Sequence, residues 1–165
     1  MAYPRTIRDY NAFIDGVSYF GKSTEATLPK LALQTEDHRG AGMDAPIAID
    51  MGMQGMTADV SFAEWSPELC HLFGTRKTLV LRPGALGEDD FTADTYIFTI
   101  GGRWSGWEGS TLKAGGSVPL KLTTSVHYFK AEFNGAQLFE IDIENGKRII
   151  NGVDQLASMR QAMGL

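Results

Sequence analysis

Apolar residues alternate with polar ones along much of the chain, and the longest such stretch runs from Val118 to Ile143. Its two halves are rich in β-branched and aromatic residues and flank Asn134-Gly135, a pair typical of a two-residue type I′ hairpin turn. Pairing the two strands outward from that turn puts apolar side chains on both faces of the hairpin. One face holds Phe129, Ala131, Phe133, Ala136, Leu138 and Glu140. The other face holds Val126, Tyr128, Lys130, Glu132, Gln137, Phe139, Ile141 and Ile143. A surface hairpin normally has one polar face. We therefore expect this ribbon to cover the core on one side and a neighbour on the other, which favours assembly over catalysis.

The apolar alternation of the ribbon changes phase between Tyr128 and Phe129. A β-bulge at that point would shift the register and turn Glu140 from the core side to the opposite side. The environment of this carboxylate therefore depends on where the strands slip.

Four further segments have strand patterns: residues 27–34, 46–61, 77–82 and 94–107. Gly101-Gly102 predicts a bend within the last of them. Two segments predict helices. Ser66-Pro67 combines an N-cap with proline at the first helical position, and Gly74 follows at the end. The second helix spans residues 153–163, where apolar side chains recur at helical spacing. The predicted fold is mainly β, an antiparallel β-sandwich or half-open barrel with one short internal helix and a C-terminal helix.

The chain of 165 residues is long enough for one domain, and no linker or repeat divides it, so residues 1–165 are expected to form a single domain. The formal net charge of -5 argues against a general nucleic-acid or anionic-membrane binder. Cys70 is the only cysteine, which excludes an internal disulfide. Residues 1–8 lack the apolar run of a secretory signal, and no stretch approaches the ~20 apolar residues of a membrane span, so we expect synthesis in a cytoplasm.

Residues 16–23, G-V-S-Y-F-G-K-S, fit the spacing of a phosphate-binding P-loop. That site also needs a buried strand before the loop, small residues within it and a substantial helix after it. Tyr19 and Phe20 are bulky, and Pro29 follows too soon for a long helix. We therefore favour a turn beside an edge strand, with nucleotide binding as the weak alternative.

No other residues form a convincing chemical site, so we expect no catalytic residue, no metal and no cofactor. The histidines and Cys70 lack paired ligand spacing, and Cys70 is better placed as a helix core residue. The acidic segment 88–94 lacks the spacing of an EF-hand, so a solvated turn is preferred over weak Ca²⁺ binding. Trp104 and Trp107 suit the core and a subunit interface better than sugar or base stacking. Met51 and Met53 share strand parity and could line one contact face.

Four stretches, taken in order, make the chain resemble the major tail tube proteins of contractile-tailed bacteriophages and R-type tailocins. They are M-A-Y-P-R-T-I at the N-terminus, T-L-P-K-L at residues 27–31, E-D-H-R-G-A-G-M-D-A-P-I-A-I-D-M-G-M at residues 36–53, and N-G-V-D-Q-L-A-S-M-R-Q-A-M-G-L at the C-terminus. The resemblance extends over nearly the whole chain, which would then be one tail-tube domain.

The resemblance implies a structural, non-enzymatic protomer whose hexameric rings stack into a hollow tube for DNA or ions inside a contractile sheath. Its implied partners are copies of itself, the sheath protein, a baseplate initiator, and a tape-measure protein or DNA in the lumen; its implied location is the virion tail or tailocin particle. Residues expected near ring contacts are Arg39, Met43, Asp44, Pro46, Met51, Met53, Met163 and Leu165. Lumen-facing acids are expected among Glu132, Glu140 and Asp142. A secretion-system tube protein with similar rings is the alternative.

Overall fold

The computed structural model describes all of residues 1–165 and is mainly β, with antiparallel strands and two short helices, as predicted. In chain order the elements are β1 (Thr6–Ile14), β2 (Val17–Ser18), β3 (Ser23–Thr27), β4 (Leu33–His38), β5 (Ile47–Met53), β6 (Met56–Phe62), α1 (Pro67–Cys70), β7 (Leu79–Leu86), β8 (Asp94–Gly109), β9 (Leu120–Phe133), β10 (Ala136–Asp142), β11 (Lys147–Ile150), β12 (Val153–Asp154) and α2 (Ala157–Ala162).

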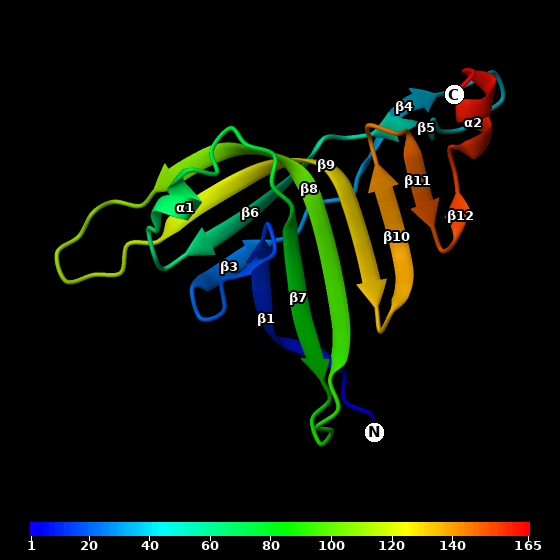
Figure 1. Cartoon of the computed structure of the whole chain (residues 1–165). Helices are drawn as coiled ribbons and strands as arrows, with labels where there is room; N and C mark the ends of the chain where they lie inside the picture. Colours follow the sequence, from blue (N-terminus) through cyan, green and yellow to red (C-terminus); the bar gives the residue numbers. More distant parts are fainter.

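One large sheet organises the molecule, with the strand order β12-β11-β10-β9-β8-β7-β1-β2, and it does not close into a barrel (Figure 1). Strand β9 belongs to two layers, because one of its edges pairs with β6 along residues 120–126 and with β10 along residues 128–133. Strands β6 and β3 therefore form a second layer over part of the main sheet. The result is a β-sandwich that is open at one end.

The main sheet bends at Gly101-Gly102, as predicted, where the β8–β9 register slips and leaves His127 without a partner on β8. The backbones approach closely here: a Cβ on Gly102 would lie 2.0 Å from the carbonyl oxygen of Ser125. The bulge explains the phase change in β9, since both Val126 and Phe129 are buried although three positions separate them.

A buried cluster fills the space between the layers. Trp104 is its largest fully buried side chain, and Phe62, Leu120 and Leu122 surround it without measurable exposure. Six strands contribute because their inward positions alternate, as β6 shows with Met56, Ala58, Val60 and Phe62 buried in turn. Cys70 packs against this cluster as a free thiol, as expected.

The β9–β10 hairpin has the predicted two-residue turn, with positive φ at both Asn134 and Gly135. The predicted faces are wrong beyond Gln137, because a bulge at Leu138 shifts the register. Glu140 now lies opposite Lys130, and Ile141 lies opposite Phe129 in the core. Glu140 is therefore turned away from the core, through a slip in β10 rather than one between Tyr128 and Phe129.

Three boundary predictions need correction. The expected strand at residues 46–61 is two strands in separate sheets, because β5 ends at Met53 and β6 begins at Met56. The expected strand at residues 27–34 is interrupted, because β3 ends at Thr27 and β4 begins only at Leu33, beyond Pro29. The expected C-terminal helix is shorter, because the Asn151-Gly152 turn makes residues 153–154 a strand. Helix α1 begins as predicted, with the Ser66 hydroxyl accepting a hydrogen bond from the Leu69 amide.

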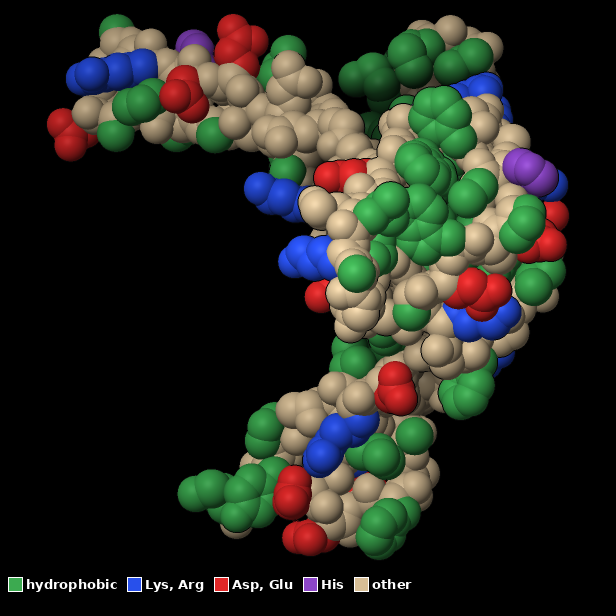
Figure 2. Space-filling model, turned by 90° about the vertical axis from the view of Figure 1, so that its left-hand side faces the viewer, with side chains coloured by type: hydrophobic (Ala, Val, Ile, Leu, Met, Phe, Trp, Pro, Cys, Tyr) green, Lys and Arg blue, Asp and Glu red, His purple; other side chains and the backbone are tan.

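Strands β4 and β5 form a separate two-stranded hairpin, which we call the arm (residues 33–53). The arm stands at the top of Figure 1 and projects freely from the body at the top left of Figure 2. Almost all of its residues are exposed, so it has no core of its own. An isolated hairpin is marginally stable in water, so the arm needs a further surface to rest on.

Candidate assembly interface

The isolated chain exposes more surface than a compact monomer does. Its accessible area is 10653 Å², whereas a monomeric protein of 18.0 kDa exposes about 8,000 Å². Many large apolar side chains contribute, among them Phe20, Phe73, Phe91 and Leu112. Apolar surface on this scale is typical of a subunit whose contacts are completed by other chains.

The main sheet has unpaired edges at both ends. Strand β1 pairs with β7 on one side, but on the other it meets β2 only at Phe13 and Ile14, so residues 6–11 keep an open edge. At the far end the sheet finishes with the short β12, which carries the exposed Val153. Open edges present unpaired N–H and C=O groups that pair readily with another chain.

The arm carries an apolar stripe on β5, formed by Ile47, Ile49 and Met51, which are 54%, 44% and 57% exposed. Glu36 and Asp37 on β4 are exposed and form no ion pair within the chain. At the tip, the Arg39 guanidinium donates to the carbonyl of Met43, which closes the turn, while Asp44 and Pro46 stay exposed. The arm therefore presents apolar and acidic groups that have no partner in the monomer.

Met53 does not share a contact face with Met51. A bulge around Gly52, whose φ is 115°, breaks the alternation, so Met53 packs against the core cluster while Met51 faces solvent. The Asp50 carboxylate accepts one hydrogen bond from the Gly52 amide and another from the Arg148 guanidinium of β11, at 2.7 Å. Both bonds, the one from Gly52 more than the one from Arg148, hold the pKa of Asp50 below its usual range. The pair ties the base of the arm to the main sheet.

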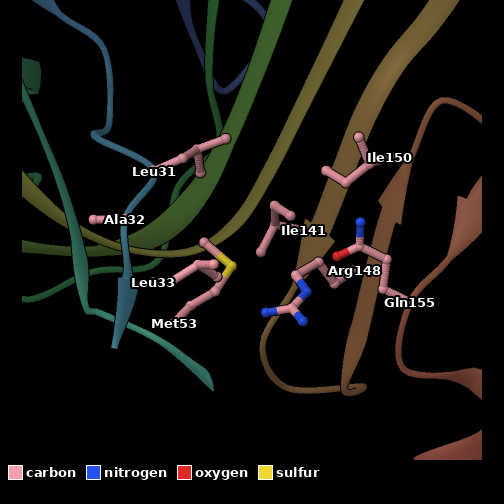
Figure 3. A pocket seen from close by; sticks show the side chains of 8 residues that line it. All are labelled: Leu31, Ala32, Leu33, Met53, Ile141, Arg148, Ile150 and Gln155. Atoms are coloured by element: carbon pink, nitrogen blue, oxygen red, sulfur yellow. The ribbon is translucent and has the colours of Figure 1, made fainter. Parts of the chain in front are cut away.

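A groove lies beside this pair, between the base of the arm and strands β10 and β11 (Figure 3). Its cavity has a volume of about 190 Å³ and is mostly apolar, lined by Leu31, Ala32, Leu33, Met53, Ile141, Arg148, Ile150 and Gln155. The Arg148 side chain is only 11% exposed. Its Nε atom is buried and has no hydrogen-bond partner. Buried N–H groups are nearly always paired, so this donor is an exception within the monomer.

The three predicted lumen acids lie together on the face of β9 and β10 that points away from the core. Glu140 lies opposite Lys130, Asp142 lies opposite Tyr128, and Glu132 is 3.4 Å from the Lys130 ammonium. We call this the polar face. Partial burial, followed by the charge of Glu140, raises the pKa of Tyr128. The charges of all three acids therefore reach the same part of the face, because each of them contributes to the raised pKa of Tyr128.

Helix α2 buries none of its residues, and Met159, Met163 and Leu165 are exposed. Its position depends on Arg160, which donates to Asp154 at 2.6 Å and to the Gly146 carbonyl at 2.8 Å. The hydrogen bond from Arg160 lowers the pKa of Asp154 to about 2. The predicted contact residues Met163 and Leu165 are thus exposed on an element held by a few polar bonds.

This arrangement predicts that α2 loosens in acid. The Asp154 carboxylate favours the docked helix above its unfolded pKa of about 4, and that contribution disappears as pH falls through about 2. Protection of the Met163 and Leu165 amides, measured as the exchange rate relative to the intrinsic rate at the same pH, should therefore fall over this range while protection in β9 is kept. Asp154→Asn should show the lower protection already at neutral pH. Equal protection of α2 at both ends of the range would contradict the assignment.

An aromatic patch lies at the end of the molecule that carries α1 and the loop of residues 110–119, the end facing the viewer in Figure 2. Trp65 and Trp107 stack edge to face there with ring centres 5.5 Å apart, and both remain partly exposed. Trp104, by contrast, is wholly buried. Of these two tryptophans, Trp104 therefore belongs to the core, and Trp107 is exposed at the surface.

The nucleotide-binding hypothesis for residues 16–23 is wrong. Ser23 begins strand β3, where a P-loop needs a helix. Lys22 pairs with Glu64 at 2.9 Å, and the amides of Lys22 and Ser23 donate to the Tyr19 carbonyl. The segment is a turn between strands.

The acidic segment is engaged by arginines. Arg5 pairs with Asp90 and Asp94, and Arg8 pairs with Glu88. No group of three or more His, Cys, Asp or Glu side chains is placed to hold a metal ion. Neither helix has the length and apolar content needed to cross a membrane.

Known proteins share both the sequence and the architecture. The chain matches the family model described as phage tail tube protein FII over residues 4–164. It is 32% identical to the tail tube protein of Escherichia phage P2, with all of both chains covered. It is also 39% identical to the major tail tube protein of Serratia phage KSP20 over 61 residues, which cover 37% of this chain and 36% of that one.

Two solved assemblies contain chains of the same fold. One is the sheath–tube complex of an extracellular contractile injection system, PVC, in its extended state, with a TM-score of 0.59, 9% identity, and coverage of 79% of this chain and 92% of that one. The other is the six-fold symmetrised baseplate of the anti-feeding prophage, with a TM-score of 0.55, 12% identity, and coverage of 80% and 97%. At these identities the likeness concerns the fold.

Proposed function

Because the chain belongs to the phage tail tube protein FII family, we propose that its copies form six-membered rings that stack into the inner tube of a contractile tail. The open edges of the main sheet carry the proposal most directly. A ring that joins β1 of one copy to the β11–β12 end of the next pairs both ends of the main sheet, so neither end keeps an open edge. Six copies accord with the symmetry of the anti-feeding prophage baseplate.

The polar face lines the lumen in this arrangement. The core side of the main sheet is taken up by β3 and β6, so the opposite side, with Glu132, Glu140 and Asp142, is free to face the channel. Carboxylates repel the phosphates of DNA, so a passing genome does not adhere to the wall. The sheath surrounds the tube, and a tape-measure protein or DNA occupies the channel.

The arm reaches between rings. When the sheet edges face neighbours within a ring, the strand ends face the rings above and below. The arm leaves from one such end and carries the unpartnered stripe of Ile47, Ile49 and Met51. Repetition of one head-to-tail contact gives an open-ended stack, which is the geometry of a tube.

Electron microscopy of the purified protein at high concentration, with and without a tail initiator, tests this function. We expect six-fold rings and hollow tubes. A protein that stays monomeric under every condition, initiator included, would refute the proposal.

Met51→Asp is expected to prevent tube formation, because it places a charge within the apolar stripe of the arm. Met51 is 57% exposed and does not pack against the core, so circular dichroism and the unfolding midpoint should be unchanged. We expect at least a tenfold drop in pelletable tubes, while Met51→Leu keeps them. Normal tubes from the aspartate variant would show that the stripe lies outside the contact.

A tube for an injection particle that carries protein rather than DNA is the second candidate, since both solved neighbours belong to contractile injection systems or related prophage particles. Particles purified from producing cells separate the two. Nuclease-protected DNA identifies a phage tail, and its absence from intact particles identifies an injection device or tailocin.

A further inference from the structure

We propose that Phe91 of a copy in one ring inserts into the groove beside Arg148 of a copy in the next ring, so that the stack is held by a knob and a socket. The inference rests on the proposed tube function and names the side chains of its axial contact. Knob and socket lie at opposite ends of the same chain, as a head-to-tail stack requires.

Phe91 is unusual for a large aromatic residue because its side chain is 97% exposed. It sits in the loop between β7 and β8, at the bottom of Figure 1, beside the N-terminus. Burying such a ring against apolar side chains stabilises a contact. The monomer offers it nothing to pack against.

The loop is nevertheless held in place. Arg5 pairs with Asp90 and donates to the Thr92 carbonyl, so both neighbours of Phe91 are fixed. The Asp90 carboxylate also accepts from the Thr92 amide at 2.8 Å. A side chain on an anchored loop loses less conformational entropy when it docks. The loop therefore presents Phe91 in a defined position.

The groove has the size and chemistry to receive it. An apolar cavity of about 150 Å³ holds benzene, and the groove has about 190 Å³, with Leu31, Leu33, Met53 and Ile141 around it. Methionine sulfur contacts aromatic rings favourably. Figure 3 shows these side chains converging on the cavity from the arm and from β10.

Electrostatics also match. Arg148 is the only charged residue that lines the groove. Beside the knob, Asp89 is exposed and forms no ion pair within the chain, whereas Glu88 and Asp90 pair with arginines. Docking Phe91 therefore brings an unpaired negative charge to a groove whose one charged residue is positive. Opposite charges across a contact favour the correct pairing.

The positions of the two features suit axial stacking. The molecule is hollowed on one side between the arm at its top and the lobe at its bottom (Figure 2). The β7–β8 loop lies at the bottom and the groove lies at the base of the arm, so one copy placed above another brings the loop of the upper towards the groove of the lower. No change within the chain is needed for either feature to be accessible.

Cysteine cross-linking in assembled tubes tests the contact. In a Cys70→Ala background, Ala93→Cys, an exposed position beside the intact Phe91, is combined with Gln155→Cys, which lies on the exposed rim of the groove. A short thiol-to-thiol cross-linker should then give a ladder of covalent oligomers. The matched control combines Ala93→Cys with Gln137→Cys, an exposed residue near the hairpin turn at the loop's own end, and should give none.

The outcomes are separable. Tubes without an Ala93–Gln155 ladder, or with a ladder only in the control pair, overturn the knob and socket but leave the tube intact. Absence of tubes from the unmodified chain, initiator included, overturns the tube function and the contact with it. A second variant checks the energetics: Phe91→Asp should raise the critical concentration for stacking at least tenfold with unchanged circular dichroism, while Phe91→Leu changes it less. Stacking of Phe91→Asp at the normal concentration would also overturn the proposal.

Discussion

Gly102→Ala should destabilise the chain by about 3 kcal/mol or more, because the added methyl group has no space. Its carbon would lie 2.0 Å from the Ser125 carbonyl oxygen and 2.8 Å from the carbonyl carbon, and both atoms are backbone of the adjacent strand. Strands β8 and β9 would have to separate at the bend that lets one sheet feed two layers. Urea unfolding of the unassembled chain, followed by circular dichroism, measures the loss.

Gly101→Ala is the matched control for this prediction. Its methyl group would lie 3.2 Å from the Tyr128 Cβ, a side-chain atom that can shift by a few tenths of an ångström. We expect a loss of about 1 kcal/mol at this position. Similar losses for the two variants would mean that the bend does not depend on close backbone approach.

Trp104→Ala should cost about 3–5 kcal/mol, the range for removing a large aromatic side chain from a core. Trp104 has no exposed surface, and its indole N–H donates to the Lys77 carbonyl at 3.1 Å. Its backbone accepts from Gly74 and donates to Thr75, so the residue also holds the connection between α1 and β7. Denaturant unfolding of the monomer gives the free energy.

Trp107→Ala provides the comparison, since Trp107 is 42% exposed and contacts Trp65 by edge. Its loss should cost about 1–2 kcal/mol. A larger effect at position 107 than at position 104 would contradict the assignment of core and surface.

Local patterns predicted the parts of the fold that local chemistry decides. Asn134-Gly135 forms its type I′ turn because both residues tolerate positive φ. Ser66 caps α1, and Gly101-Gly102 bends β8. The bulge at Leu138 had no such signal, because it depends on Phe139 and Ile141 both packing towards the core. The C-terminal helix begins later than expected, because residues 153–154 pair with β11 and Asp154 bonds to Arg160 and Leu156, which pattern alone does not reveal.

The residues of the proposed assembly interface could be predicted only in part from the sequence. The methionines drew attention to residues 51 and 53, yet Ile47 and Ile49 share the parity of Met51 and complete its stripe, a signal present in the alternation itself. Arg148 could not be identified, since its lack of an acceptor depends on β11 meeting the base of the arm. Phe91 lay within a segment interpreted as a solvated acidic turn, and only the pairing of its neighbours with Arg5 shows that the turn is fixed.

Strand β9 has a mechanical consequence. All of its 14 residues except His127 pair on both edges, and through this strand the β3–β6 layer is joined to the main sheet. A load along the strand is shared by many bonds that must break together, so the two layers move as one body rather than sliding apart. Resistance to shear between the layers is therefore built into each subunit before any neighbour contributes to it.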